Sequence, residues 1–383
     1  MKIKILAVGK LKEKAYQNRI NEYVKWINRD IPVELIFLKD NDKVNKKLLA
    51  HINTKDHTIC LSEEGKKRSS KEFSKLLFYK DLDHTFIIGG PDGLPKHIKE
   101  KANQIFSLSD IRTLDEEGAH FKSHLDGSKH LFTPENVVDI QRILGSDIMM
   151  ILDECPPYPS DYAYAKNSME LTHRWAKRGR KQFLETQALY GHQQAQFGIV
   201  QGGTYKDLRI ASAEFMAEQD FEGIAIGGLS VGEPIPLLYE MTDINTDVLP
   251  KKKVRYLMGV GTPANLLESI ARGVDMFDCV MPTRNARNGT IFTRNGKVNL
   301  RNSKWKNHYA VLDEDFPSDL CQKYQMSYVH HLLKTNELFG MTLASEHNLQ
   351  FYLWLMKEIR AHIQKDTFAS WYPDMVRRLE SKI

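Results

Sequence analysis

The sequence has few of the features that mark a secreted, membrane-bound or disulfide-stapled protein. Its four cysteines stand far apart among 383 residues and form no Cys-x-x-Cys pair, which favours a reducing, cytoplasmic setting. No apolar run approaches ~18 residues, so we expect neither a membrane-spanning helix nor a membrane partner. The apolar stretch at the start is short, and we expect a strand there rather than a signal peptide.

Charge is distributed unevenly along a chain of otherwise ordinary globular composition. Residues 1–110 carry 22 Lys and Arg against 15 Asp and Glu, a net charge of +7, whereas the remaining residues carry 32 against 34, a net charge of −2. Such an asymmetry indicates two blocks with different partners. A Lys-rich solvated surface on the first block accounts for the difference equally well.

The first block alternates β-branched runs with amphipathic stretches, which is typical of a parallel sheet with crossover helices. Strands are expected at residues 3–8, 33–38, 57–62, 84–88 and 105–108. Helices are expected at residues 15–27, 43–52, 70–79 and 95–104.

The second block begins with a turn-rich stretch at 110–133 and then repeats the same alternation. Strands are expected at residues 147–152, 196–200, 223–226, 254–260 and 275–280, and helices at 162–178, 205–218, 263–272, 322–337 and 348–364. Five strand–helix units indicate a (β/α) barrel that lacks strands or a doubly wound sheet. Both folds place active sites at the carboxyl ends of their strands, where Asp153, Gln201, Gly228 and Asp278 stand in this sequence.

A glycine-rich turn follows the expected strand at 84–88. Gly89, Gly90 and Gly93 would let a ligand approach the backbone, and the helix after them would favour an anion. A plain tight turn between a strand and a helix is the simpler alternative.

Residues 1–108 resemble the SPOUT-type methyltransferases that N3-methylate a pseudouridine of 23S ribosomal RNA. The resemblance rests on residues 1–10, 61–66, 69–73 and 86–93. It implies a partial α/β-knot domain with ribosomal RNA as a partner, and it makes the three glycines a candidate S-adenosylmethionine loop. Because the resemblance stops near Ser109, the knotted segment that completes the cofactor pocket is missing, and we expect no methyl transfer.

A strongly basic segment lies between Cys279 and Leu312, which contains no acidic residue. Its seven cations are Arg284, Arg287, Arg294, Lys297, Arg301, Lys304 and Lys306. Asn288-Gly289 and Asn295-Gly296 are typical of hairpin turns. We therefore predict a basic hairpin beside Asp278 that neutralises nucleic-acid phosphates; a solvated hairpin with a structural aspartate is the alternative.

Residues from about 105 to the end resemble the bacterial tRNA-guanine transglycosylases, also called queuine tRNA-ribosyltransferases. The resemblance rests on residues 153–159, 198–203, 227–233, 256–263 and the segment around Asp278. It implies a zinc-containing TIM-type (β/α) barrel that works as a homodimer in queuosine biosynthesis and exchanges guanine at the tRNA wobble position for a 7-deazaguanine. We expect two domains, residues 1–108 and residues 109–383, of which the second is an incomplete barrel.

The same resemblance implies roles for individual residues. Asp278 would attack C1′ of the target ribose, because a carboxylate can form a covalent glycosyl intermediate. Asp153 would bind the amino and ring N–H edge of the base, Gln201 and Gly228 its carbonyl, and Met258 its face. Two segments would contact tRNA: Gly259, Val260, Gly261, Thr262, Pro263, Ala264 and Asn265; and Thr283, Arg284, Asn285, Ala286 and Arg287.

Two parts of the family pattern are missing. Lys99 stands where the family has the aspartate that serves as general acid and base, and Asn103 replaces the aromatic residue that stacks on the base. Of the four zinc ligands, only Cys321 and His347 are present, because Phe316 and Ser318 stand at the other two positions. We expect a transglycosylase with impaired turnover and no tightly held zinc. The alternatives are a non-catalytic tRNA-binding subunit and a ribosomal RNA methyltransferase with an incomplete cofactor site.

Overall fold

The computed structural model describes residues 1–9, 14–39, 44–53, 56–67, 70–78, 82–89, 94–107, 112–123, 128–314 and 316–383. The chain divides into two compact units, one of Met1–Leu114 with Ala119–Leu131 and one of Asp115–Gly118 with Phe132–Ile383. Within the described residues, no helix is long and apolar enough to cross a membrane.

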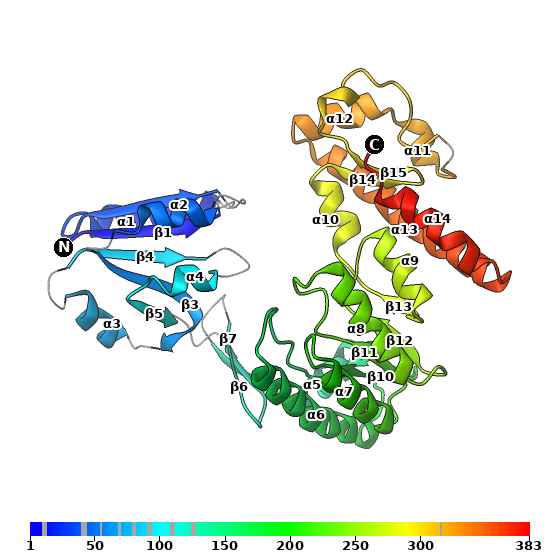
Figure 1. Cartoon of the computed structure of the whole chain (residues 1–383), viewed down its shortest axis with the longest axis horizontal. Coiled ribbons are helices and arrows are strands. Elements are labelled where there is room, and N and C mark those ends of the chain that lie inside the picture. The colour runs from blue at the N-terminus through cyan, green and yellow to red at the C-terminus, as the bar shows by residue number, and fades with distance from the viewer. Residues whose placement is uncertain are drawn as a thin grey trace. The chain divides into compact units, whose positions relative to one another are not determined.

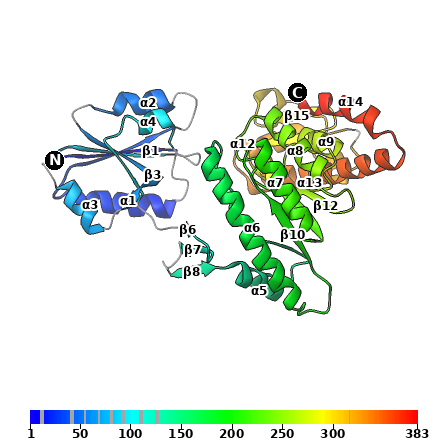
Figure 2. The same ribbon diagram turned by 60° about the horizontal axis from the view of Figure 1, so that its bottom comes forward.

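The first unit is built on a five-stranded parallel sheet with the order β2-β1-β4-β3-β5. Strands β1, β4, β3 and β5 are labelled in Figure 1. Its strands are β1 Ile3–Val8, β2 Val33–Leu38, β3 His57–Lys67, β4 His84–Ile88 and β5 Gln104–Ser107. Helices α2 (Val44–His51) and α4 (Lys96–Lys99) cover one face, and α1 (Lys14–Ile27) and α3 (Ser70–Leu77) cover the other (Figure 2). This arrangement confirms the predicted sheet with crossover helices.

One prediction for this part of the chain is wrong, and the turn-rich stretch contains more regular structure than the sequence indicated. The helix expected at 95–104 is a single turn, because the backbone and side chain of Asn103 pair with Thr58 of β3 and return the chain to the sheet. The turn-rich stretch forms an antiparallel sheet of three strands that are too short to show a periodic pattern: β6 Arg112–Leu114, β7 Ala119–Lys122 and β8 Lys129–Phe132.

The second unit contains a curled, five-stranded parallel sheet with the order β13-β12-β11-β10-β9, which we call the half-barrel. Its strands are β9 Ile148–Met150, β10 Ala195–Val200, β11 Gly223–Ile226, β12 Val254–Leu257 and β13 Met276–Phe277. Its helices are α5 Pro134–Leu144, α6 Tyr162–Glu185, α7 Lys206–Glu218, α8 Ile235–Val248 and α9 Pro263–Ala271. The expected incomplete TIM-type barrel is thereby confirmed.

The rest of the second unit is mostly helical. It consists of α10 Met281–Arg287, the hairpin strands β14 Thr290–Thr293 and β15 Gly296–Asn299, a 3-10 turn at Ser303–Trp305, α11 Asp319–Lys323, α12 Met326–Lys334, α13 Leu338–Gln364 and α14 Phe368–Glu380. The helix expected at 322–337 is divided, because the N–H of Met326 bonds to Ala310 O. The helix expected at 348–364 begins at Leu338 instead.

The segment after β13 also differs from its prediction. The strand expected at 275–280 ends at Phe277, because Val280 is already helical and caps α10. Asn288-Gly289 is not a hairpin turn: Gly289 ends α10 with φ +87° and donates its N–H to Ala286 O. Only the turn at Arg294 and Asn295, before Gly296, joins two strands.

Candidate active site

Five candidate residues follow the five strands of the half-barrel in order: Asp153 after β9, Gln201 after β10, Gly228 after β11, Met258 after β12 and Asp278 after β13. Because the strands are parallel, these positions share the carboxyl edge of one sheet. Strands β10, β11, β12 and β13 of this sheet are labelled in Figure 1. The structure thus places all five candidates at one edge.

Asp153 and Gln201 contact each other directly. Gln201 Nε2 donates to Asp153 Oδ2 at 2.6 Å, and the Gln201 side chain is completely buried. Its backbone N–H donates to Ser212 Oγ at 3.0 Å, and Ser212 lies 2.9 Å from His173 Nε2. Burial lowers the pKa of His173 to about 4, so the ring is neutral where it shares this hydrogen bond with Ser212. Helices α6 and α7 therefore hold Gln201 in position.

Gly228 lines a small pocket at the same edge. The other lining residues are Pro156, Pro157, Tyr158, Ser160, Gly203, Thr204, Tyr205 and Val231. Gly228 has φ +66°, and a Cβ at this position would collide with Gln201 Oε1. The loop that follows is held by Glu233, whose carboxylate accepts the N–H groups of Ser230 and Val231.

Asp278 is held through one of its two carboxylate oxygens. Oδ1 accepts the Tyr256 hydroxyl at 2.7 Å and the Gly259 N–H at 2.9 Å. Burial raises the pKa of Tyr256, and the hydrogen bond to Asp278 raises this pKa further. The phenol therefore stays protonated and donates its proton to the hydrogen bond. In the described part of the chain, Oδ2 accepts no hydrogen bond. A carboxylate with one fixed and one open oxygen is suited to nucleophilic attack.

The first segment expected to contact tRNA points largely into the protein. Val260, Pro263 and Ala264 are buried, and Thr262 and Asn265 form the capping box of α9. Gly259 is exposed, and Ser230 Oγ donates to its carbonyl at 3.2 Å. Contacts from this segment to a ligand would therefore come mainly from the backbone near Gly259.

The second segment forms α10, on which Arg284 and Arg287 are exposed and Ala286 is buried. Two cations of the basic segment have partners within the protein: Arg294 pairs with Asp313 at 3.5 Å, and Arg301 donates to Leu333 O at 2.7 Å. The exposed cations are Arg284, Arg287, Lys297, Lys304 and Lys306. They lie on α10, the hairpin and the 3-10 turn, rather than on one hairpin as predicted.

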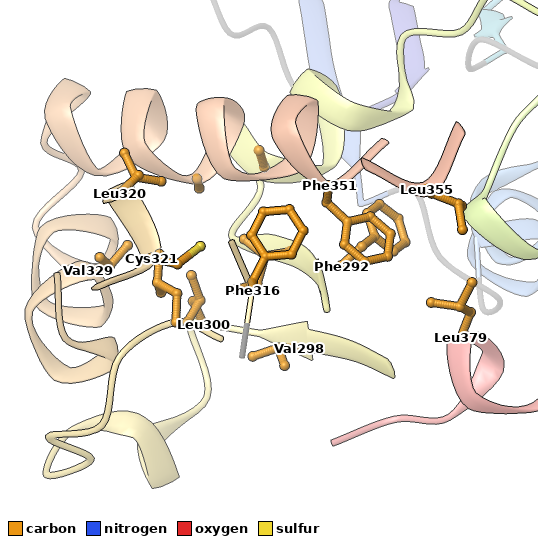
Figure 3. Close-up of a cluster of buried hydrophobic side chains, with 14 of the residues drawn as sticks. Phe292, Val298, Leu300, Phe316, Leu320, Cys321, Val329, Phe351, Leu355 and Leu379 are labelled. Atoms are coloured by element: carbon orange, nitrogen blue, oxygen red, sulfur yellow. The ribbon is translucent and has the colours of Figure 1, made fainter. Parts of the chain in front are cut away.

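Cys321, His347, Phe316 and Ser318, which the sequence predicts at the positions of zinc ligands, do not converge as a four-ligand site. Cys321 Sγ lies 3.0 Å from His347 Nδ1, and His347 Nε2 lies 2.8 Å from Phe292 O. Phe316 is buried beside them, and its ring packs on His347 and Phe351. Figure 3 shows Phe316 between Cys321 and Phe351 in this core. Burial raises the pKa of the Cys321 thiol to about 11. These residues do not fit a structural zinc, which takes four nitrogen or sulfur ligands.

No other described residues offer a metal site, since no group of three His, Cys, Asp or Glu side chains converges among them. Lys99 and Asn103, which the sequence predicts at the positions of the acid and the stacking residue, belong to the first unit. Asn103 is engaged with Thr58 there. Gly89 follows β4, whereas Gly90 and Gly93 lie outside the described residues.

Three site residues were missed in the sequence: Tyr256, Arg209 and Glu233. Tyr256 and Glu233 lie inside motifs that were noticed for other residues. Arg209 lies on the buried stripe of α7 with Ser212, Ala213 and Met216, and a charged residue on an apolar stripe is the feature that could have identified it.

Comparison with known proteins agrees with this geometry. The family model described as queuine tRNA-ribosyltransferase matches residues 95–381, and the one described as predicted SPOUT methyltransferase matches residues 1–117. The queuine tRNA-ribosyltransferase of Caldanaerobacter subterraneus subsp. tengcongensis is 53% identical over 275 residues, which are 72% of this chain and 72% of that protein. Its namesake in Bacillus subtilis is 47% identical over 279 residues, 72% of this chain and 71% of that protein. From about residue 95 onward, the chain belongs to the queuine tRNA-ribosyltransferase family.

Proposed function

We propose that this protein exchanges guanine at the wobble position of tRNA for a 7-deazaguanine, through a covalent bond between Asp278 and the ribose. The observation that carries the proposal is the open Oδ2 of Asp278, whose partner oxygen is held by Tyr256 and the Gly259 N–H. In this mechanism Oδ2 attacks C1′ while the bond from C1′ to guanine N9 breaks. The incoming base then attacks C1′ through its own N9 as that nitrogen loses its proton, and Asp278 is released.

The base would be recognised by residues that follow the other four strands of the half-barrel. Asp153 would accept the amino and ring N–H groups once Gln201 Nε2 turns from Asp153 toward the base carbonyl. The Gly228 N–H would donate to the same carbonyl, and Met258, which is partly buried against the half-barrel core, would pack on the ring face. The exposed cations on α10 and the hairpin would bind tRNA phosphates.

We further propose that turnover is slow. Two protons must move, one onto the leaving guanine and one off the incoming base, and Lys99 stands in place of the aspartate that the family uses for this transfer. Loss of a general acid or base typically lowers the rate by ~10²–10⁴-fold. Glu154, which is buried and bonded to the Tyr164 hydroxyl at 2.6 Å, and water are the candidates to replace it.

We propose that no zinc is held at Cys321 and His347. The support is the donor set, in which thiol and imidazole bond to each other and Phe316 and Ser318 supply no ligand. Ser318 Oγ bonds instead to the side chain of Gln350. A homodimer is also implied by the resemblance, and sedimentation of the purified chain would test it.

The test of the function is incubation with unmodified tRNA and labelled guanine. We expect slow incorporation of label and a protein–tRNA adduct that survives a denaturing gel. Binding of tRNA without incorporation or adduct would contradict exchange and favour a tRNA-binding subunit. Methyl transfer from labelled S-adenosylmethionine to ribosomes would instead favour activity of the first unit.

A further inference from the structure

Arg209, near the start of α7, is a completely buried cation behind the pocket. In the described part of the chain, no carboxylate lies within ion-pair distance of it. Its guanidinium instead donates to backbone carbonyls at the ends of two neighbouring strands. Nε bonds to Gly203 O at 2.6 Å, and Nη1 bonds to Gly227 O at 2.6 Å and to Val200 O at 3.4 Å. Glu233 stabilises this charge only from beyond ion-pair distance. Because burying a charge without a direct counter-ion is costly, we expect a function of Arg209 that offsets this cost.

The bond to Gly227 sets the direction of the next N–H group. In a planar trans peptide, the carbonyl of one residue and the N–H of the next point in opposite directions. With the Gly227 carbonyl held by Arg209, the Gly228 N–H points away from Arg209, and Gly228 lines the pocket. Two successive glycines, with φ +66° at Gly228, would let this peptide turn over if nothing held the carbonyl.

The positive charge also lies directly behind the pocket wall. A Cβ built on Gly228 would lie 3.2 Å from Arg209 Nη2 and in collision with Gln201 Oε1. Among the described residues, neither Nη2 nor Oε1 has a hydrogen-bond partner, although both are buried. A fixed positive charge in such a dry environment strengthens N–H donation from the peptide it holds and favours a ligand oxygen with partial negative charge.

We propose that Arg209 is a positioning residue that makes this pocket selective for bases with a carbonyl oxygen, by holding the Gly228 N–H toward it. The proposal rests on the proposed function, in which guanine and 7-deazaguanine share this carbonyl. A base with an amino group at the same place would face a second donor and be rejected, since two donors cannot pair.

The experiment compares guanine with 6-thioguanine, which keeps the amino and ring N–H edge but replaces the carbonyl oxygen by sulfur, a weak acceptor. Affinities of both bases are measured by calorimetry for the wild type, Arg209→Gln and Arg209→Lys. We expect the wild type to prefer guanine by about 10-fold, the worth of one hydrogen bond. Arg209→Gln should reduce this preference to about twofold or less, and Arg209→Lys should give an intermediate value.

The matched control is Arg180→Lys, a similarly buried arginine of α6 that pairs with Glu222 at 2.9 Å instead of holding a pocket carbonyl. It should leave the preference unchanged. In the exchange assay, Arg209→Gln should raise KM for guanine by about 10-fold with kcat within about twofold. General loosening of the fold would weaken both bases alike and lower kcat.

An unchanged preference for guanine in folded Arg209→Gln would overturn the inference while leaving the proposed function intact. If Arg209→Gln does not fold, Arg209→Lys decides, and an unchanged preference overturns the inference in the same way. A wild type that binds neither base would overturn the proposed function and this inference together.

Discussion

The pocket of the half-barrel keeps the residues expected from the family, whereas the core around Phe316 does not. At the carboxyl edge of the sheet, Asp153, Gln201, Gly228, Met258 and Asp278 are all present and adjacent in strand order. Around Phe316, by contrast, Phe and Ser stand at two of the four positions where the resemblance implies zinc ligands. Catalysis requires particular atoms at particular positions. A structural metal only stabilises a fold, and a well-packed apolar core can provide the same stability.

The largest effect is expected at the nucleophile. Asp278→Asn removes the attacking carboxylate, so guanine incorporation should fall by at least ~10³-fold and the covalent adduct with tRNA should disappear. Asp275→Asn, at the amino end of β13, where Asp275 pairs with Arg255 away from the carboxyl edge, is the matched control and should keep activity within about twofold of wild type. An adduct that persists in Asp278→Asn would show that another group attacks the ribose.

The core around Phe316 should respond through stability. Phe316 is 2% exposed and contacts the rings of His347, Phe351 and Trp354. Phe316→Ala should lower the free energy of unfolding in urea by about 3–5 kcal/mol, because it leaves a cavity. Phe339→Ala, at a residue that is 45% exposed, should cost less than ~1 kcal/mol. Equal costs for the two variants would refute the view that Phe316 fills the place of a metal.

Acid should lower the free energy of unfolding through protonation of His173, which supports Gln201 by way of Ser212. Burial lowers the pKa of His173 to about 4, against ~6.5 in the unfolded chain. A histidine with a depressed pKa contributes its full stability above pH ~6.5 and loses it as pH falls toward 4, about 2–3 kcal/mol in all. His173→Gln should flatten the stability–pH curve in that window, whereas His308→Gln, at an exposed position, should not. Parallel stability–pH curves for the wild type and His173→Gln would show that protonation of His173 does not cause the loss of stability.

A smaller effect is expected from Tyr256, which positions the nucleophile. Tyr256→Phe removes one of the two hydrogen bonds to Asp278 Oδ1 and should lower kcat by about 10-fold, with KM for guanine unchanged. Tyr309→Phe, at a residue that is 68% exposed, should behave as wild type. A rise in KM with unchanged kcat would place Tyr256 in base binding instead.

The smallest effect is expected from metal removal. Chelation should move the melting temperature by less than ~1 °C, and metal analysis should find well under one zinc per chain, because only two ligands are present. The double variant Phe316→Cys with Ser318→Cys completes the ligand set and should acquire about one equivalent of zinc. One full equivalent in the wild-type protein would overturn the proposal of a metal-free core.

Much of the fold could be predicted because it depends on local pattern. The strand at 223–226 and the alternation around it follow from apolar runs and turn residues, and the motifs at Asp153, Gln201 and Asp278 stand directly after such runs. The end of β13 could not be predicted, because Asp278 turns back to Tyr256 and Gly259 through bonds that span 22 and 19 residues. The hairpin turn predicted at Asn288-Gly289 was wrong because a glycine with positive φ is as common at the end of a helix as in a hairpin turn.

The sequence by itself determined the order of the five strands and of helices α6, α7 and α9 in the half-barrel, the presence of the pocket residues, and the absence of cysteine at positions 316 and 318. Only the tertiary structure decided that the buried charge of Arg209 holds the Gly227 carbonyl and that the Phe316 ring packs on His347. The physical reason is distance along the chain. Periodicity reports which face of an element is buried, but the partner of a buried side chain lies 18 residues away for Arg209 and 31 for Phe316, and only folding brings the two together.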